Sequence, residues 1–241
     1  MWESGLSFPP RQSVIPGIKP EISPPMEHFP RTVTPEILDT LDAGHPDAIR
    51  SRLDLRRLDA FLGGSRWIVR SVLEHRDAAA CGIVELGAGE GCLCKTLGAR
   101  LGGCPVTGLD LAAPAVPLGA GVHWKTGDFF QSLPSLAGGI VVGSLILHHF
   151  ERMALRDLGA MLGRFRVLLF SEPLRHPVPL LLSRFASPFV GEVTRHDMPA
   201  SIRAGFRPGE LGRLLGLNPT HWNISESSLL TGVLRFKAWR D

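Results

Sequence analysis

A short apolar run followed at once by a glycine-rich loop is the feature that most constrains the fold of this chain. Residues Gly82 to Leu86 predict a strand, and the loop Gly87-Ala88-Gly89-Glu90-Gly91 follows without a break. A helix is predicted next, from about Cys92 to Leu101, and a second strand, Pro105 to Leu109, ends at Asp110. A strand, a helix and a strand in this order form a βαβ unit, which requires a parallel sheet.

The alternation of strands and helices continues to the end of the chain. Further strands are predicted at Val122–Lys125, Gly139–Leu147, Arg166–Phe170, Thr220–Ile224 and Leu229–Trp239, with helices at Glu151–Gly163 and about Pro208–Leu215. The continuous apolar runs are typical of strands covered on both faces, and the last two strands indicate an antiparallel pair. We therefore expect a doubly wound, Rossmann-like α/β fold whose mainly parallel seven-stranded sheet ends on an antiparallel strand, with N-terminal helices added.

The chain divides into three predicted parts. Residues 1–35 contain eight prolines and predict an extended arm, because prolines this dense interrupt helices and paired strands. Residues 36–78 predict a helical cap with helices at Asp47–Phe61 and Arg66–His75, and residues 79–241 form the main domain, with a lid segment at about 174–206. Within that segment the apolar run Pro177–Val190 forms either a lid over a lipophilic ligand or a helix that packs in the core, and we favour the core-packing helix.

The net charge and the cysteine content exclude few classes of function. The net charge is +3, which does not by itself indicate nucleic acid. The first predicted helix contains four arginines, which either face nucleic acid or form an ion-paired surface. We favour the ion-paired surface for Arg50, Arg52, Arg56 and Arg57.

The cysteines Cys81, Cys92, Cys94 and Cys104 lack metal-site spacing and are interpreted as buried free thiols. We predict no bound metal, no membrane span and a cytoplasmic location.

The glycine loop predicts a ligand site. In open α/β sheets ligands bind beyond the carboxyl ends of the strands, and glycines let backbone amides approach them closely. Such a loop serves a dinucleotide or another nucleotide-like ligand equally well, and Asp110 suits a ribose in both cases. Two residues argue against a dinucleotide: Cys92 occupies the third fingerprint position, and the charge of Glu85 would oppose a pyrophosphate.

Four motifs occur in a fixed order: Val84 to Gly91, Asp110 at the end of the second strand, Gly127-Asp128-Phe129-Phe130, and Ser144-Leu145-Ile146-Leu147-His148-His149-Phe150. This series resembles that of class I methyltransferases that use S-adenosylmethionine (SAM). The likeness runs from about Ile83 to the terminal strand pair. Three other segments look similar to a bacterial subgroup acting on small molecules: Leu53 to Arg57, Arg175-His176-Pro177 and Arg195-His196-Asp197.

The resemblance implies SAM as the cofactor, S-adenosylhomocysteine as its product, and a set of cofactor contacts. The backbone of Gly87, Ala88 and Gly89 would meet the methionine part, with Glu85 close by. Asp110 would hold the ribose hydroxyls, Asp128 would accept from the adenine amino group, and Phe129 would pack on the ring. Leu111, Gly127 and Ser144 complete the predicted set. The alternative for Asp110 and Asp128 is a turn or helix-cap role.

The chemistry is expected after the fourth strand of the series. His148 and His149 are candidate bases, since histidine titrates near neutral pH, and for each a structural role is an equal alternative. Only one is expected to reach the acceptor. Glu172, His176, Arg195 and His196, with His148, are candidate acceptor-binding residues, against a default of surface ion pairing.

The implied activity is methyl transfer to a small lipophilic, phenolic or polyketide-like acceptor. Oxygen is favoured as the methylated atom, and carbon, as in a quinone precursor, is the next choice. A non-catalytic SAM-binding accessory protein and an NAD-dependent dehydrogenase remain alternatives. A DNA base methyltransferase is disfavoured because Ser144 to Leu147 replaces the polar-Pro-Pro-aromatic tetrad of such enzymes. The expected partner is the small-molecule acceptor, with a homodimer as a further option and no nucleic acid.

Overall fold

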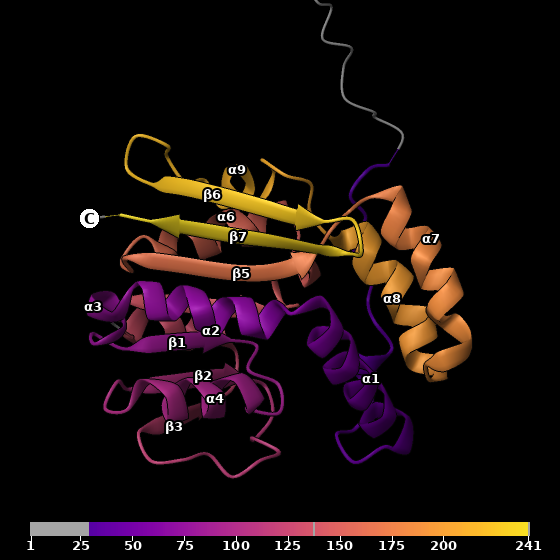
Figure 1. Ribbon diagram of the computed structural model, residues 1–241, viewed down its shortest axis with the longest axis horizontal. Helices are drawn as coiled ribbons and strands as arrows, with labels where there is room; N and C mark the ends of the chain where they lie inside the picture. Colours follow the sequence, from indigo (N-terminus) through magenta and orange to yellow (C-terminus); the bar gives the residue numbers. More distant parts are fainter. Residues whose placement is uncertain (1–28, 137, 241) are drawn as a thin grey trace, which may run out of the picture.

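A seven-stranded sheet forms the centre of the computed structural model, which describes residues 29–136 and 138–240 (Figure 1). The strand order is β3-β2-β1-β4-β5-β7-β6. Strands β1 to β5 run parallel, whereas β7 pairs antiparallel with both β5 and β6. The bounds are β1 Ile83–Leu86, β2 Val106–Asp110, β3 Val122–Thr126, β4 Ile140–Ser144, β5 Val167–Pro173, β6 Asn223–Leu229 and β7 Val233–Trp239. The predicted fold class is confirmed.

Helices cover both faces of this sheet, as a doubly wound fold requires. The helices are α1 Pro46–Leu62, α2 Gly64–Glu74, α3 Arg76–Ala79, α4 Cys92–Leu101, α5 Phe129–Ser132, α6 Arg152–Leu162, α7 Pro177–Ala186, α8 Glu192–Ala204 and α9 Leu211–Leu214, with 3-10 turns η1 Leu38–Thr40, η2 Leu133–Ser135, η3 Leu147–His149 and η4 Ser187–Phe189. Alternate residues of the strands enter two separate cores. Val141 and Leu168 pack with α6 and α9, whereas Ile140 and Leu169 pack with α2 and α4. Figure 1 shows α2 and α4 on the opposite side of the sheet from α6 and α9.

The fourth strand is shorter than the predicted run Gly139–Leu147. It ends at Ser144, and the backbone then turns through Leu145, which has the left-handed φ of 56° that non-glycine residues rarely adopt. The amides of Ile146 and Leu147 donate to the buried carboxylate of Glu172, at 3.0 and 2.9 Å. The Glu172 carboxylate thus replaces the strand pairing that is lost, and the turn η3 forms. The local sequence does not reveal this acceptor, because it lies on another strand.

The prediction that the apolar run Pro177–Val190 packs in the core is wrong. This run forms α7 and η4, which lie at one side of the molecule beside α8 (Figure 1). Several of its large side chains are exposed, among them Phe185 at 68% and Phe189 at 78%. Apolar composition alone did not distinguish a core helix from one with an exposed apolar face.

The segment from Phe29 to Leu41, here called the strap, crosses the carboxyl end of β4. The Arg31 guanidinium donates to the backbone oxygens of Ala204, His148 and Phe150, at 2.7, 3.0 and 2.9 Å. It also lies 4.7 Å over the ring of Phe206. The predicted extended arm is observed only from Phe29 onward, because residues 1–28 lie outside the described part of the chain.

The arginines of α1 form ion pairs, as expected. Arg50 and Arg57 lie 3.4 and 3.5 Å from Asp54, and Arg52 and Arg56 both pair with Glu90 of the glycine loop.

The four cysteines are free thiols, as predicted, but only Cys94 is buried. The burial prediction is therefore wrong for the exposed Cys81 and Cys92, and Cys104 is half-buried. Within the described ranges, no helix combines the length and apolarity needed to cross a membrane.

Replacing Gly159 of α6 with alanine is expected to destabilise the fold by about 3 kcal/mol, the upper range for overpacking. A Cβ at this position would lie 1.8 Å from the backbone oxygen of Leu215, which no side-chain rotation relieves. Urea unfolding measures the loss. Gly119→Ala is the control, because its Cβ would meet no atom within 4 Å. Equal stabilities of the two variants would contradict the described packing of α6 on Leu215.

Candidate active site

The glycine loop lies where the strand order reverses, because β2 and β4 flank β1 on opposite sides. Gly87, Gly89 and Gly91 all have left-handed φ values, of 61°, 55° and 83°. A Cβ on Gly87 would lie 2.5 Å from Ile146, so the loop packs directly against the turn that follows β4. A Cβ on Gly89 would meet nothing within 4 Å. The loop thus presents open backbone at the switch point, where α/β sheets bind ligands.

Glu85, in the middle of β1, is buried, and burial favours the protonated form of its carboxyl. Burial raises the pKa of its carboxyl to about 8, and the thiol of Cys94 on α4 donates to it at 2.8 Å. Burial also raises the pKa of the Cys94 thiol. Consequently Glu85 does not carry the negative charge by which the sequence argument opposed a pyrophosphate.

Asp110 and Asp128 occupy the ends of β2 and β3 and contact backbone amides. One oxygen of Asp110 accepts from Gly89 at 2.7 Å and the other from Ala112 at 2.9 Å. Asp128 caps α5 by accepting from Phe130 at 2.9 Å. These contacts are the turn and cap roles weighed above. Asp110 is half-buried and Asp128 is exposed, so both remain accessible to a ligand.

The other predicted cofactor residues surround the same sheet edge with different exposure. Phe129 is buried, 4.9 Å from the Phe130 ring in a stacked arrangement and 5.5 Å from Phe150 edge-on. Leu111 is 78% exposed, and Ser144 is half-buried at the end of β4. Gly127 has a φ of 129° and open space where a Cβ would lie. The structure therefore brings the predicted set to the carboxyl ends of β1, β2, β3 and β4.

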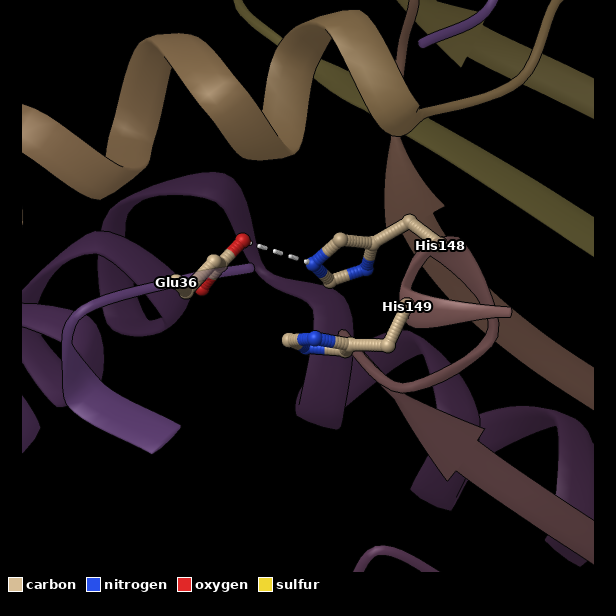
Figure 2. Close-up of side chains that lie close together, drawn as sticks. All are labelled: Glu36, His148 and His149. Carbon is tan, nitrogen blue, oxygen red and sulfur yellow. Dashed lines mark ion pairs between the residues drawn. The ribbon is translucent and has the colours of Figure 1, made fainter. Parts of the chain in front are cut away.

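His148 lies between two carboxylates. Its Nδ1 is 2.9 Å from Glu172 at the end of β5, and its Nε2 is 3.3 Å from Glu36 of the strap (Figure 2). His148 is only 2% exposed and Glu172 is fully buried. Burial disfavours the charged imidazole, but the two carboxylates outweigh burial and raise the pKa of His148 to about 9. The same contact lowers the pKa of Glu36 against the opposing effect of burial.

His149 lies beside His148 and is more accessible. Its side chain is 24% exposed, its Nδ1 is 3.2 Å from Asp39 of the strap, and its ring centroid is 4.2 Å from that of His148. The hydrogen bond from His149 lowers the pKa of Asp39. The two histidines therefore each have a carboxylate at Nδ1.

Of the remaining predicted acceptor residues, His176 directly precedes α7, and Arg195 and His196 lie on α8. His176 caps α7 by accepting from the amide of Val178 at 3.2 Å. Arg195 and His196 are exposed on α8, and His196 lies 2.8 Å from Asp197. The buried Asp197 itself accepts from the strap amides Ile37 and Leu38, at 2.9 and 3.0 Å.

The sequence argument missed the strap residues Arg31, Glu36 and Asp39. Their only signal was the presence of charged side chains beside a proline-rich segment. Arg175, which the sequence indicates only as part of the segment Arg175-His176-Pro177, is buried, and its guanidinium donates to the backbone oxygens of Phe29 and Gly205. These contacts attach the strap to the end of β5.

Comparison with solved structures identifies the class of fold. The chain is similar to the plantazolicin methyltransferase BpumL in complex with a desmethylplantazolicin analogue and S-adenosylhomocysteine, with a TM-score of 0.62 and 13% identity over 81% of this chain and 91% of that one. It is also similar to human N-acetylserotonin methyltransferase in complex with SAM, with a TM-score of 0.54 and 16% identity over 84% of this chain and 61% of that one.

A third similar structure is magnesium protoporphyrin IX methyltransferase from Synechocystis PCC 6803 with bound SAM, with a TM-score of 0.52 and 14% identity over 83% of this chain and 88% of that one. The chain therefore has the Rossmann-like fold of class I methyltransferases. No family model matches the sequence, and a search of curated proteins finds no match.

Proposed function

We propose that this chain is a SAM-dependent methyltransferase that methylates a hydroxyl group of a small, apolar or phenolic acceptor. One observation carries the proposal: His148, paired with Glu172 of β5, lies in the turn after β4, and that turn packs against the glycine loop through Ile146 and Gly87. A nucleotide-like ligand on the loop would therefore lie next to a histidine that a carboxylate orients. The methyltransferase fold supports the choice of SAM over a dinucleotide.

The cofactor residues proposed from the sequence fit this assignment. The open backbone at Gly89 and Gly127 leaves space beside the half-buried Asp110 and the exposed Asp128. We assign ribose binding to Asp110 and adenine binding to Asp128 and Phe129. A ligand at Asp110 would share its carboxylate with the Gly89 amide, so loop and ligand would be held by the same side chain.

His148 would act as the base through Nε2. SAM would supply a methyl group on a sulfonium for transfer to the acceptor oxygen, with S-adenosylhomocysteine as the leaving group. When the acceptor displaces Glu36, His148 loses one of the two carboxylates that raise its pKa, and the imidazole can release its proton to solvent. The hydroxyl proton then passes to Nε2 of neutral His148, and Glu172 stabilises the resulting imidazolium through Nδ1, as the carboxylate does in catalytic triads. Glu36 now lies 3.3 Å from Nε2, so the acceptor must displace it.

We assign the helix residues to acceptor entry. His176, Arg195 and His196 lie on α7 and α8, and α8 holds the strap through Asp197. Movement of these helices would open the strap and give access to His148. The exposed apolar side chains of α7 suit a lipophilic acceptor or a second copy of the chain, and the homodimer stays a prediction.

A second candidate is the non-catalytic SAM-binding protein. The observation in its favour is that the strap leaves His148 only 2% exposed. Both candidates predict that SAM and S-adenosylhomocysteine raise the melting temperature. A ligand at a concentration of about a hundred times its Kd adds about 2.7 kcal/mol to the free energy of unfolding. The dehydrogenase alternative predicts instead that NADH stabilises the chain and SAM does not. A thermal shift with all three ligands would refute the SAM assignment if only NADH raised the melting temperature.

Asp110→Asn is expected to weaken SAM binding by roughly 10- to 100-fold, since a hydrogen bond to a charged acceptor contributes about 1.5–3 kcal/mol. Isothermal titration with S-adenosylhomocysteine measures the change. The matched control is Asp157→Asn, which alters an exposed aspartate of α6. Unchanged affinity in Asp110→Asn would contradict the ribose-binding role.

A further inference from the structure

We propose that Glu36, His148 and His149 form a binding site for a divalent transition metal, which ties the strap to the turn after β4. The three residues come from distant parts of the sequence and point toward one another (Figure 2). One oxygen or nitrogen ligand atom from each lies within 4.8 Å of the others. Two histidines and one carboxylate are a common metal-binding set that leaves a further coordination position open.

The distances suit a metal with little rearrangement. The Glu36 oxygen and His148 Nε2 are 3.3 Å apart. Two ligand atoms at zinc distances in a tetrahedral site are separated by about 3.4 Å. This pair therefore already has the spacing of two metal ligands. His149 completes the set, because its ligand nitrogen lies within 4.8 Å of the Glu36 and His148 ligand atoms.

Both histidines also have the outer contacts that metal-binding histidines use. Such histidines donate the second ring N–H to a carboxylate or a carbonyl, which fixes the ring and the tautomer. Here the Nδ1 of His148 lies 2.9 Å from Glu172, and the Nδ1 of His149 lies 3.2 Å from Asp39. With both Nδ1 atoms engaged, Nε2 is the ring nitrogen of each histidine that is left for a metal.

The local charge also favours a cation. Three carboxylates, Glu36, Glu172 and Asp39, contact the two imidazoles, and the first two are buried. The guanidinium of neighbouring Arg31, which donates to the backbone oxygens of His148 and Phe150, offsets one of these negative charges, and two more remain. Buried carboxylates are costly without a balancing charge, which protons or one divalent ion can supply. Imidazole with carboxylate selects zinc, cobalt, nickel or iron rather than magnesium.

Occupation of this site has a consequence that rests on the proposed function. A metal on Nε2 of His148 blocks the atom assigned to receive the acceptor proton. It also holds Glu36 in place and thereby keeps the strap over the acceptor site. Metal binding and methyl transfer therefore exclude each other, and the ion inhibits the enzyme.

Cobalt binding tests the site without any activity assay. The full chain, free of a histidine tag and treated with chelator, is titrated with Co²⁺ alone, and its visible ligand-field absorption is recorded. We expect saturation at one ion per chain. Glu36→Gln and His149→Asn should each weaken binding by at least ten-fold. Asp39→Asn, which keeps all three ligands, should weaken it by roughly 10- to 100-fold. His221→Asn, at an exposed histidine, is the control and should bind normally.

Two results would overturn the metal site: no saturable absorption band, or equal cobalt affinity in the wild type, Glu36→Gln and His149→Asn. Circular dichroism checks that each variant is folded. The inhibitory consequence is tested separately. More Zn²⁺ should be needed to inhibit Asp39→Asn than the wild type, each measured against its own zinc-free rate. If no methyl transfer is found with any acceptor, the proposed function fails while the cobalt result still decides the metal site.

Discussion

His148→Gln should lower the rate of methyl transfer by roughly 100- to 10,000-fold, the usual contribution of a general base. The amide of glutamine is not basic enough to take up the proton that the acceptor passes to Nε2 of His148. The rate is measured as S-adenosylhomocysteine release at saturating SAM. Because the loop residues are unchanged, S-adenosylhomocysteine should still raise the melting temperature of the variant.

The control and a second variant keep this prediction testable. His221→Asn alters an exposed histidine and should retain the wild-type rate. His148→Gln also leaves the buried Glu172 with its amide donors but without its ring partner, which can destabilise the fold. Glu172→Gln is therefore tested as well. It keeps the shape of the side chain, weakens the support of the imidazolium and should also lower the rate. A folded His148→Gln chain with more than half of the wild-type rate would exclude His148 as the base.

Glu85→Gln should raise the free energy of unfolding at pH 7 by roughly 3 kcal/mol. This value follows from the difference between pH 7 and the ordinary pKa of glutamate, because the wild-type carboxyl loses stability over that pH range and glutamine does not. Burial raises the folded-state pKa of Glu85 to about 8, from an ordinary value of about 4.5. Its protonated form is therefore favoured in the folded state. The associated stability is fully present below about pH 4.5 and is lost progressively as the pH rises toward 8. Glutamine carries no titrating proton and removes this dependence.

Urea unfolding of both proteins from pH 5 to pH 8 measures the effect. The difference in unfolding free energy between Glu85→Gln and the wild type should increase with pH. Glu192→Gln, at an exposed glutamate of α8, is the control and should show no such increase. A difference that is constant over this range would mean that Glu85 is ionised in the folded protein.

The sheet was predictable because its signals are local. Each buried strand is a short apolar run, and the left-handed glycines after β1 mark the ligand loop whatever lies elsewhere in the chain. Asp110 ends β2 and Asp128 follows the neighbouring parallel strand β3, and topology alone brings such ends to one edge. The edge of the sheet at which the site lies, and most of its candidate residues, therefore followed from the sequence.

The acceptor side was not predictable, because it depends on contacts between distant residues. Glu36 and His148 are separated by more than a hundred positions, and no local pattern pairs them. The sequence predicts residues 29–35 of the strap only as part of an extended arm and residues 36–41 as part of the helical cap. Its anchors on Ala204 and Asp197 emerge only in the folded chain. Likewise, the apolar run of α7 looks like core until the packing of α8 is known.

Mass spectrometry with methyl-labelled SAM tests the central claim most directly. The purified chain is incubated with labelled SAM and a mixture of small metabolites rich in hydroxylated aromatic compounds. We predict that S-adenosylhomocysteine accumulates and that one metabolite gains a single labelled methyl in equal amount. A chain that SAM stabilises, but that forms no S-adenosylhomocysteine with any acceptor, would contradict the account and identify a binding protein instead.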